Sequence, residues 1–214
     1  MEWAVTAKLF AALFAIMNPL SVLPIFLAMT ADQSIAERRS TAFVMMASVI
    51  VGSIVCALIG QRLLALFGID VEHFRLAGGL IVLLIALSML NGADNTAHNG
   101  TEKENAALRV SASTGVGIYP LAIPIALGPG TIATIIVFAQ SSQQAGHLVS
   151  YYAGLAGYLV FFSAFLLVAP YASAWVSPTA LSVTKRLMGL VLAAIAAEMI
   201  TGALGRLFPG WLHP

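Results

Sequence analysis

Residues 119–131 form a proline- and glycine-rich stretch in the middle of an apolar segment: Tyr119-Pro120-Leu121-Ala122-Ile123-Pro124-Ile125-Ala126-Leu127-Gly128-Pro129-Gly130-Thr131. No charged side chain occurs between Val110 and Gly146. An uncharged segment of this length suits the hydrocarbon of a bilayer, which a helix crosses in about 20 residues. The prolines break such a helix, because each lacks a backbone N–H and clashes with the turn before it.

The break has a consequence for backbone hydrogen bonding. In a regular helix the three prolines would leave the carbonyls of Val116, Pro120 and Ile125 without partners. An unpaired carbonyl costs several kcal/mol in lipid, so the break is expected only against protein or a water-filled cavity. We therefore interpret the stretch as a candidate binding site. The alternative is a packing kink, because proline and glycine are common in membrane helices.

The composition is that of an integral membrane protein in a lipid bilayer. The chain of 214 residues is 60% hydrophobic and 9% charged, whereas a soluble domain carries about 25% charged residues. The net charge of +1 and the lack of a basic stripe argue against a nucleic-acid partner. The single cysteine excludes an internal disulfide. No metal-ligand spacing and no catalytic motif occurs, so we predict no enzyme activity, metal or cofactor.

Charged residues divide the chain into six apolar runs of spanning length: residues 9–31, 40–61, 76–93, 115–140, 148–169 and 187–207, the last of which contains Glu198. The predicted fold class is all-α, a polytopic membrane protein with six transmembrane helices, of which the first and fourth are broken. Lysine and arginine are more frequent on the side that receives Arg38, Arg39, Lys103, Arg109, Lys185 and Arg186. The positive-inside rule makes this side cytoplasmic and places both termini outside.

The two halves of the chain resemble each other at an offset of about 110 residues. Asn18-Pro19-Leu20-Ser21 aligns with Gly128-Pro129-Gly130-Thr131, and Arg75-Leu76-Ala77-Gly78 aligns with Arg186-Leu187-Met188-Gly189. Three spans are an odd number, so the second half starts on the opposite side of the membrane. The sequence predicts two inverted three-helix repeats, residues 1–91 and 110–214, joined by a polar linker at residues 92–109.

The first half carries its own break, Asn18-Pro19-Leu20-Ser21-Val22-Leu23-Pro24. Its prolines are expected to move Asn18 and Leu23 out of helical geometry. Ser21 and Thr131 are the hydroxyl residues nearest the two restarting helices, so we expect them to be N-caps. Broken helices at matching positions of inverted repeats indicate a transporter site near the bilayer midplane.

Two helix starts inside the membrane would direct N–H groups and positive dipole ends towards the centre, an arrangement that suits a carboxylate. The candidate substrate-binding residues are Asn18, Pro19, Ser21, Pro24, Pro124, Gly128, Pro129, Gly130 and Thr131. Glu198 is the acidic residue well inside a span, where carboxylates are functional by default. It is the predicted coupling residue or partner of a substrate amine. The alternatives are a position close to one edge of the sixth helix, or a protonated carboxyl bonded to a neighbour.

At these residues the chain resembles the MarC family of bacterial inner-membrane proteins, within the LysE-like transporter superfamily. The resemblance covers essentially the whole chain and rests on Asn18-Pro19 through Pro24-Ile25-Phe26, Pro120 to Pro124 with Gly128 to Ala133, Arg75 to Gly79, and Arg186 to Gly189. It implies six helices with the termini outside and, as described for some relatives, transport of small neutral amino acids. One departure is Ser21, where a common family pattern has glycine.

The leading hypothesis is a secondary transporter of small neutral amino-acid-like solutes in the bacterial inner membrane. It would work by alternating access between the two halves, with H+ or Na+ as a candidate coupling ion, and export and uptake are both open. The alternative is a passive channel or a non-transporting membrane scaffold. An intramembrane enzyme would need a second catalytic group opposite Glu198, and the sequence offers none.

Overall fold

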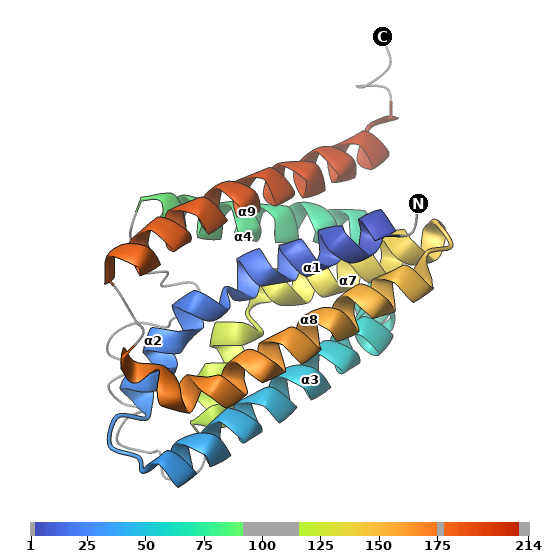
Figure 1. The fold of residues 1–214 in the computed structure, drawn as a ribbon. Helices are drawn as coiled ribbons and strands as arrows, with labels where there is room; N and C mark the ends of the chain where they lie inside the picture. Colours follow the sequence, from blue (N-terminus) through green and yellow to red (C-terminus); the bar gives the residue numbers. More distant parts are fainter. Residues whose placement is uncertain (1–2, 92–115, 175–177, 210–214) are drawn as a thin grey trace.

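The computed structural model describes residues 3–91, 116–174 and 178–209, and every regular element in these ranges is helical. Five helices are long and apolar enough to cross a membrane, or six if one strongly bent pair counts as a single span. The predicted class, an all-α polytopic membrane protein, is confirmed. Figure 1 shows the helices packed side by side as an elongated bundle.

The first half of the chain contains four helices. α1 (Trp3–Met17) and α2 (Pro19–Met29) follow each other closely and together form one apolar span. α3 (Ile35–Leu66) and α4 (Val71–Leu90) complete this half. The first span is therefore two helices, as expected of a broken helix.

The second half repeats this order. η1 (Gly117–Ala126), whose wide turns are interrupted by extended backbone at Tyr119 and Ile123, leads into α7 (Pro129–Gln144), and α8 (Leu148–Val168) continues into the short η2 (Ala169–Ala174). α9 (Pro178–Leu207) ends the described bundle. In Figure 1 the pair η1–α7 runs opposite to α1–α2, α8 opposite to α3, and α9 opposite to α4. This antiparallel relation is what an inverted repeat requires.

The contacts between helices are also similar when each helix is replaced by its counterpart in the other half. α1 packs on α8, and its counterpart pair, η1 and α7, packs on α3. α4 packs along α9, its own counterpart. The predicted linker, residues 92–109, lies outside the described residues. The exact division of the chain into residues 1–91 and 110–214 therefore stays a prediction.

Several helices begin earlier in the chain than the apolar runs that predicted them. α3 begins at Ile35 instead of residue 40, because Ser34 and Glu37 form a capping box at its start. The Ser34 N–H donates to a Glu37 carboxylate oxygen at 2.7 Å, and the Glu37 N–H donates to Ser34 Oγ. A carboxylate is favourable in the first turn of a helix. Charged residues thus ended the predicted runs but did not end the helices.

Candidate functional site

The first break is a single residue, Asn18, between α1 and α2. Its backbone is left-handed, with φ 34° and ψ 80°, a conformation that Asn tolerates better than most residues because its short side chain bonds locally. The Ser21 N–H donates to the Asn18 carbonyl at 2.9 Å and to Asn18 Oδ1 at 3.3 Å. Asn18 is therefore the N-cap, and the expectation that Ser21 would cap this helix is wrong. The cap precedes Pro19 because proline fits the first helical position, which needs no N–H.

The second proline of this break does not interrupt the helix. α2 continues through Pro24 to Met29, and Leu23 stays helical. The expectation that Leu23 would leave helical geometry is wrong. A membrane helix tolerates proline where neighbouring groups compensate the lost bond. The first break is thus sharp and confined to Asn18.

The second break is longer and more strongly bent. Within η1 the Leu121 N–H donates to the Val116 carbonyl at 3.3 Å, and the Leu127 N–H donates to the Ala122 carbonyl at 2.8 Å. These bonds reach back five residues, one more than in an α-helix. The Val116 carbonyl therefore keeps a partner, contrary to expectation, because the wider turn carries the bond past Pro120. The axes of η1 and α7 meet at 62°.

α7 begins as α2 does, with proline as its first residue. Gly128 is the N-cap and makes no side-chain cap bond, and Pro129 follows it. Gly128 and Pro129 therefore occupy the places that Asn18 and Pro19 have in the first half. Thr131 Oγ donates to the Ala126 carbonyl at 3.0 Å. The predicted capping role of Thr131 is wrong, since its hydroxyl instead pairs a carbonyl that the break leaves at the end of η1.

The two breaks approach each other in the interior. Gly130 lies so close to α1 and α4 that a Cβ there would be 2.9 Å from Ile16 Cδ1 and 3.1 Å from Ile85 Cδ1. Ile16 is two residues before Asn18. Figure 1 shows α2 and α7 leaving the middle of the bundle for opposite ends. The partly positive N-terminal ends of both helices thus lie within the bundle.

Some of the buried polar atoms without partners lie on the helices of these breaks. Asn18 is 4% exposed, and Thr131 and Thr134 are 0% exposed. Within the described residues, Asn18 Nδ2, Ser21 Oγ and Thr134 Oγ are buried and make no hydrogen bond. A buried polar group without a partner costs about 1–3 kcal/mol. These atoms can therefore bind a polar ligand.

The remaining candidate residues divide by exposure. Pro19 and Gly128 are buried beside the breaks, and Pro129 is exposed. Pro24 and Pro124 are half-buried on α2 and η1, two elements that contact each other. The structure thus brings the two break sequences together, with Pro24 and Pro124 further along their helices.

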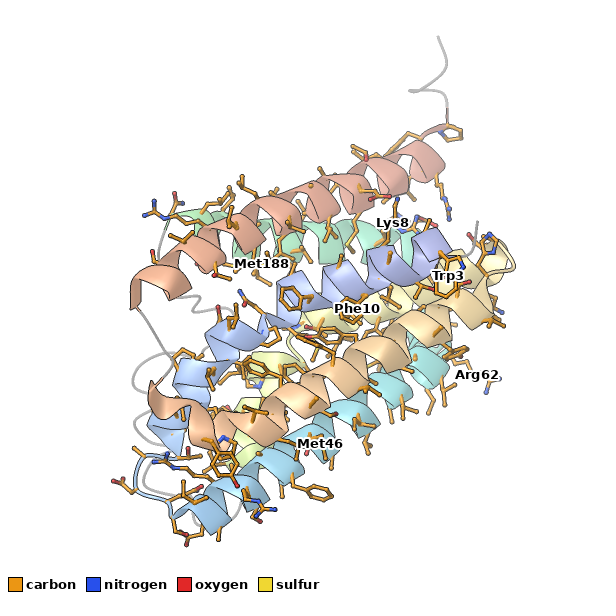
Figure 2. All side chains as sticks on the ribbon, in the orientation of Figure 1. Trp3, Lys8, Phe10, Met46, Arg62 and Met188 are labelled. Atoms are coloured by element: carbon orange, nitrogen blue, oxygen red, sulfur yellow. The ribbon has the colours of Figure 1, made fainter. Side chains whose placement is uncertain are left out.

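Glu198 is not among the break residues. Its side chain is exposed, and its carboxylate accepts a hydrogen bond from Lys8 Nζ at 2.9 Å. Lys8 lies ten residues before Asn18, which is about 15 Å along a helix axis. Figure 2 shows Lys8 between α1 and α9. The role of Glu198 as coupling residue or amine partner stays a prediction.

Sequence reasoning missed a set of polar links that join the two halves. They lie at the N-terminal end of the bundle, defined as the end where α1 and α4 begin and α7 and α9 finish. Four pairs form them: Thr6–Ser150, Lys8–Glu198, Arg75–Ser141 and Glu72–Arg206. The sequence feature that could have indicated these links is the occurrence of charged residues within otherwise apolar helices.

Comparison with known proteins agrees with this geometry. The family of MarC integral membrane proteins matches residues 3–208. The chain belongs to the MarC family. It is 33% identical to the UPF0056 membrane protein YhcE of Escherichia coli, over 99% of this chain and 97% of the relative. It is 31% identical to YvbG of Bacillus subtilis over 98% of each chain, and 30% identical to MJ1677 of Methanocaldococcus jannaschii over 91% and 93%.

Membership makes the chain a multi-pass membrane protein of the MarC family. The relatives are named as membrane proteins, and their names state no transported solute. No solved structure matches the chain. The placement of the family in the LysE-like superfamily stays a prediction.

Proposed function

We propose that this MarC-family protein transports small neutral amino-acid-like solutes across the bacterial inner membrane by alternating access, with both termini outside. One observation carries the proposal. Two helices, α2 and α7, start in the interior of the bundle, and Asn18 Nδ2, a buried donor at the start of α2, has no partner among the described residues. Transporter sites are built in this way, from discontinuous helices at the interface of inverted repeats.

The solute carboxylate is assigned to the start of α7 and to Asn18. The first N–H groups of a helix have no intrahelical partner, and in α7 the first helical bond is donated by Ile132. The N–H groups of Gly130 and Thr131 are therefore free to bind an anion. The N–H of Ser21 already donates to Asn18, so it does not take the part expected of it.

The surroundings of the site favour a small side chain on the solute. Ile16, Val82 and Ile85 surround Gly130 closely enough that a single added carbon would contact all three. An apolar wall this close excludes a bulky side chain beside the carboxylate. Glycine and alanine are the amino acids that fit this description.

The polar links at the N-terminal end fit a transporter with two alternating gates. They join α1, α4, α7, α8 and α9 across the two halves, and opening at this end requires that they separate. The described conformation is therefore closed at the N-terminal end. A coupling ion, H+ or Na+, is part of the proposal. Glu198 is its candidate acceptor, because neutralising this carboxylate would release Lys8.

The test is flux of labelled alanine into proteoliposomes that contain the purified protein. We expect saturable uptake that depends on an imposed H+ or Na+ gradient. The Asn18→Gly variant removes Nδ2 while glycine keeps the left-handed backbone, so we expect its flux to fall by about tenfold or more, the loss of one hydrogen bond to a charged group. Arg62→Gln, far from the breaks on α3, is the control and keeps its flux.

Two outcomes would decide against the proposal. Flux that neither saturates nor responds to a gradient would make the protein a passive channel. The other outcome is that no protein-dependent flux of alanine or glycine occurs under any gradient and that Asn18→Gly is indistinguishable from the parent protein. The protein would then be a membrane scaffold.

A further inference from the structure

A groove of about 360 Å³ opens between α3 and α8 at the end of the bundle opposite the N-terminal end. Arg39, Ser40 and Phe43 of α3 form one wall, and Leu167 of α8 and Pro170 of η2 form the other. We call it the α3–α8 groove. It lies apart from the helix breaks and from the polar links, and the proposed transport does not use it.

The groove changes from polar to apolar along its length. Arg39 and Ser40 lie in the first two turns of α3, beside the charged turn that precedes this span. Phe43 is one turn further into the span and is 59% exposed, and Leu167 opposite it is 56% exposed. The mouth therefore lies at the membrane boundary, while the walls lie within the hydrocarbon.

Arg39 supplies an unpaired positive charge at the polar end of the groove. The neighbouring Glu37 carboxylate is bonded to Ser34. The guanidinium of Arg38 donates to the carbonyls of Thr30 and Ala31 at 2.9 and 3.0 Å. Arg39 makes no ion pair or hydrogen bond with the described residues. A guanidinium binds phosphate through two parallel hydrogen bonds, so this side chain is available for an anionic group.

We infer that the α3–α8 groove binds an anionic phospholipid, with the phosphate at Arg39 and Ser40 and an acyl chain along Phe43 and Leu167. The molecule must combine an anion at the membrane boundary with a chain in the hydrocarbon, and a phospholipid has both. The charge distribution places this end on the cytoplasmic side, where basic pockets between transmembrane helices bind lipid headgroups. The inference depends on the membrane topology and not on transport.

Binding at this site has a structural consequence. α3 belongs to the first half of the chain and α8 to the second. A lipid in the groove contacts both helices. It therefore stabilises the association of the halves at this end of the bundle.

The experiment measures thermal unfolding of the full chain in a neutral detergent. The added ligands are phosphatidylglycerol, phosphatidylcholine with the same acyl chains, and inorganic phosphate. A ligand that binds only the folded state raises the unfolding midpoint. We expect phosphatidylglycerol to raise it by about 3 °C or more, and the other two ligands to have little effect. Retained phosphatidylglycerol per protein, measured by mass spectrometry, gives a second readout.

Variants on a single helix test the assignment of the site. We expect Arg39→Gln to weaken phosphatidylglycerol binding by about tenfold. Arg62→Gln is the matched control, because Arg62 is exposed on the same helix and projects from the bundle at its other end (Figure 2). Leu167→Trp fills the apolar wall and should weaken binding while Arg39 is intact.

Three results would overturn the inference. An equal rise of the unfolding midpoint with phosphatidylcholine would mean that the protein does not recognise an anionic headgroup. A shift with inorganic phosphate alone would identify a phosphate site without a lipid chain. Unchanged phosphatidylglycerol binding in Arg39→Gln would place the lipid elsewhere on the protein.

Discussion

At the scale of single residues, Asn18 combines a backbone role with a side-chain role. It is the non-glycine residue with positive φ among the described residues, and its Oδ1 caps α2. Alanine at this position loses the cap and must adopt a left-handed backbone. We expect Asn18→Ala to lower the free energy of unfolding by about 1–3 kcal/mol.

Glycine separates the two roles of Asn18. It adopts positive φ freely and is a fair N-cap, so Asn18→Gly should cost well under about 1 kcal/mol. The measurement is denaturant unfolding of both variants in detergent, beside the parent protein. Equal losses in the two variants would mean that the left-handed backbone is unimportant. This comparison also ensures that a flux defect in Asn18→Gly reflects the lost amide.

The Lys8–Glu198 pair makes a second prediction for individual side chains. Each charge lies within an apolar span, where a charge without a partner is costly. We expect the double variant Lys8→Met/Glu198→Leu to unfold at a higher temperature in liposomes than either single variant. Additive effects of the two substitutions would show that the charges do not interact. Flux through the double variant then reports whether Glu198 has a coupling role beyond this pair.

At the scale of helices, the approach of α8 to α1 depends on Gly154. A Cβ there would lie 2.9 Å from the Thr6 carbonyl oxygen and 3.2 Å from its Cα. Both atoms belong to the backbone of α1 and cannot rotate away. We expect Gly154→Ala to lower the free energy of unfolding by about 1–3 kcal/mol, the usual effect of overpacking.

Gly157 on the same helix is the matched control for Gly154. Nothing lies within 4 Å of a Cβ added there. Gly157→Ala should leave stability unchanged or raise it by up to about 1 kcal/mol, because alanine favours a helix over glycine. Unfolding curves of the two variants check the contact, and similar losses would argue against a close α1–α8 approach.

The two helix breaks show how far a local pattern predicts an element. The position of each break was predictable, because proline lacks an N–H wherever it stands. The shape was not. Pro24 lies within the continuous helix α2, whereas the residues before Pro120 and Pro124 in η1 are extended, and η1 is followed by a bend of 62°. In the second break the carbonyls of Val116, Ala122 and Ala126 are paired locally, by the N–H groups of Leu121 and Leu127 and by the Thr131 hydroxyl.

At the scale of the whole molecule, the polar links at the N-terminal end predict that transport requires the halves to separate there. Thr6 Oγ donates to the Ser150 carbonyl at 2.9 Å, so cysteines at these positions can be joined by a short, reducible bifunctional thiol reagent. In a Cys56→Ala background, we expect the crosslinked Thr6→Cys/Ser150→Cys protein to stop transporting alanine.

The crosslinking experiment carries its own controls. Reduction of the crosslink should restore alanine flux, and the single Thr6→Cys variant should be unaffected by the reagent. Flux that continues through fully crosslinked protein would contradict alternating access at this end. A passive channel of fixed shape would behave in that way.

The amino-acid sequence alone determined that the chain is an all-α membrane protein with broken first and fourth spans. Hydrophobic length and missing proline N–H groups are local properties that add up along the chain. Packing in three dimensions determined that Lys8 pairs with Glu198, 190 residues away, and that Gly130 lies against Ile16. Such contacts depend on how the helices of the two halves are placed against each other, and no stretch of sequence contains that arrangement.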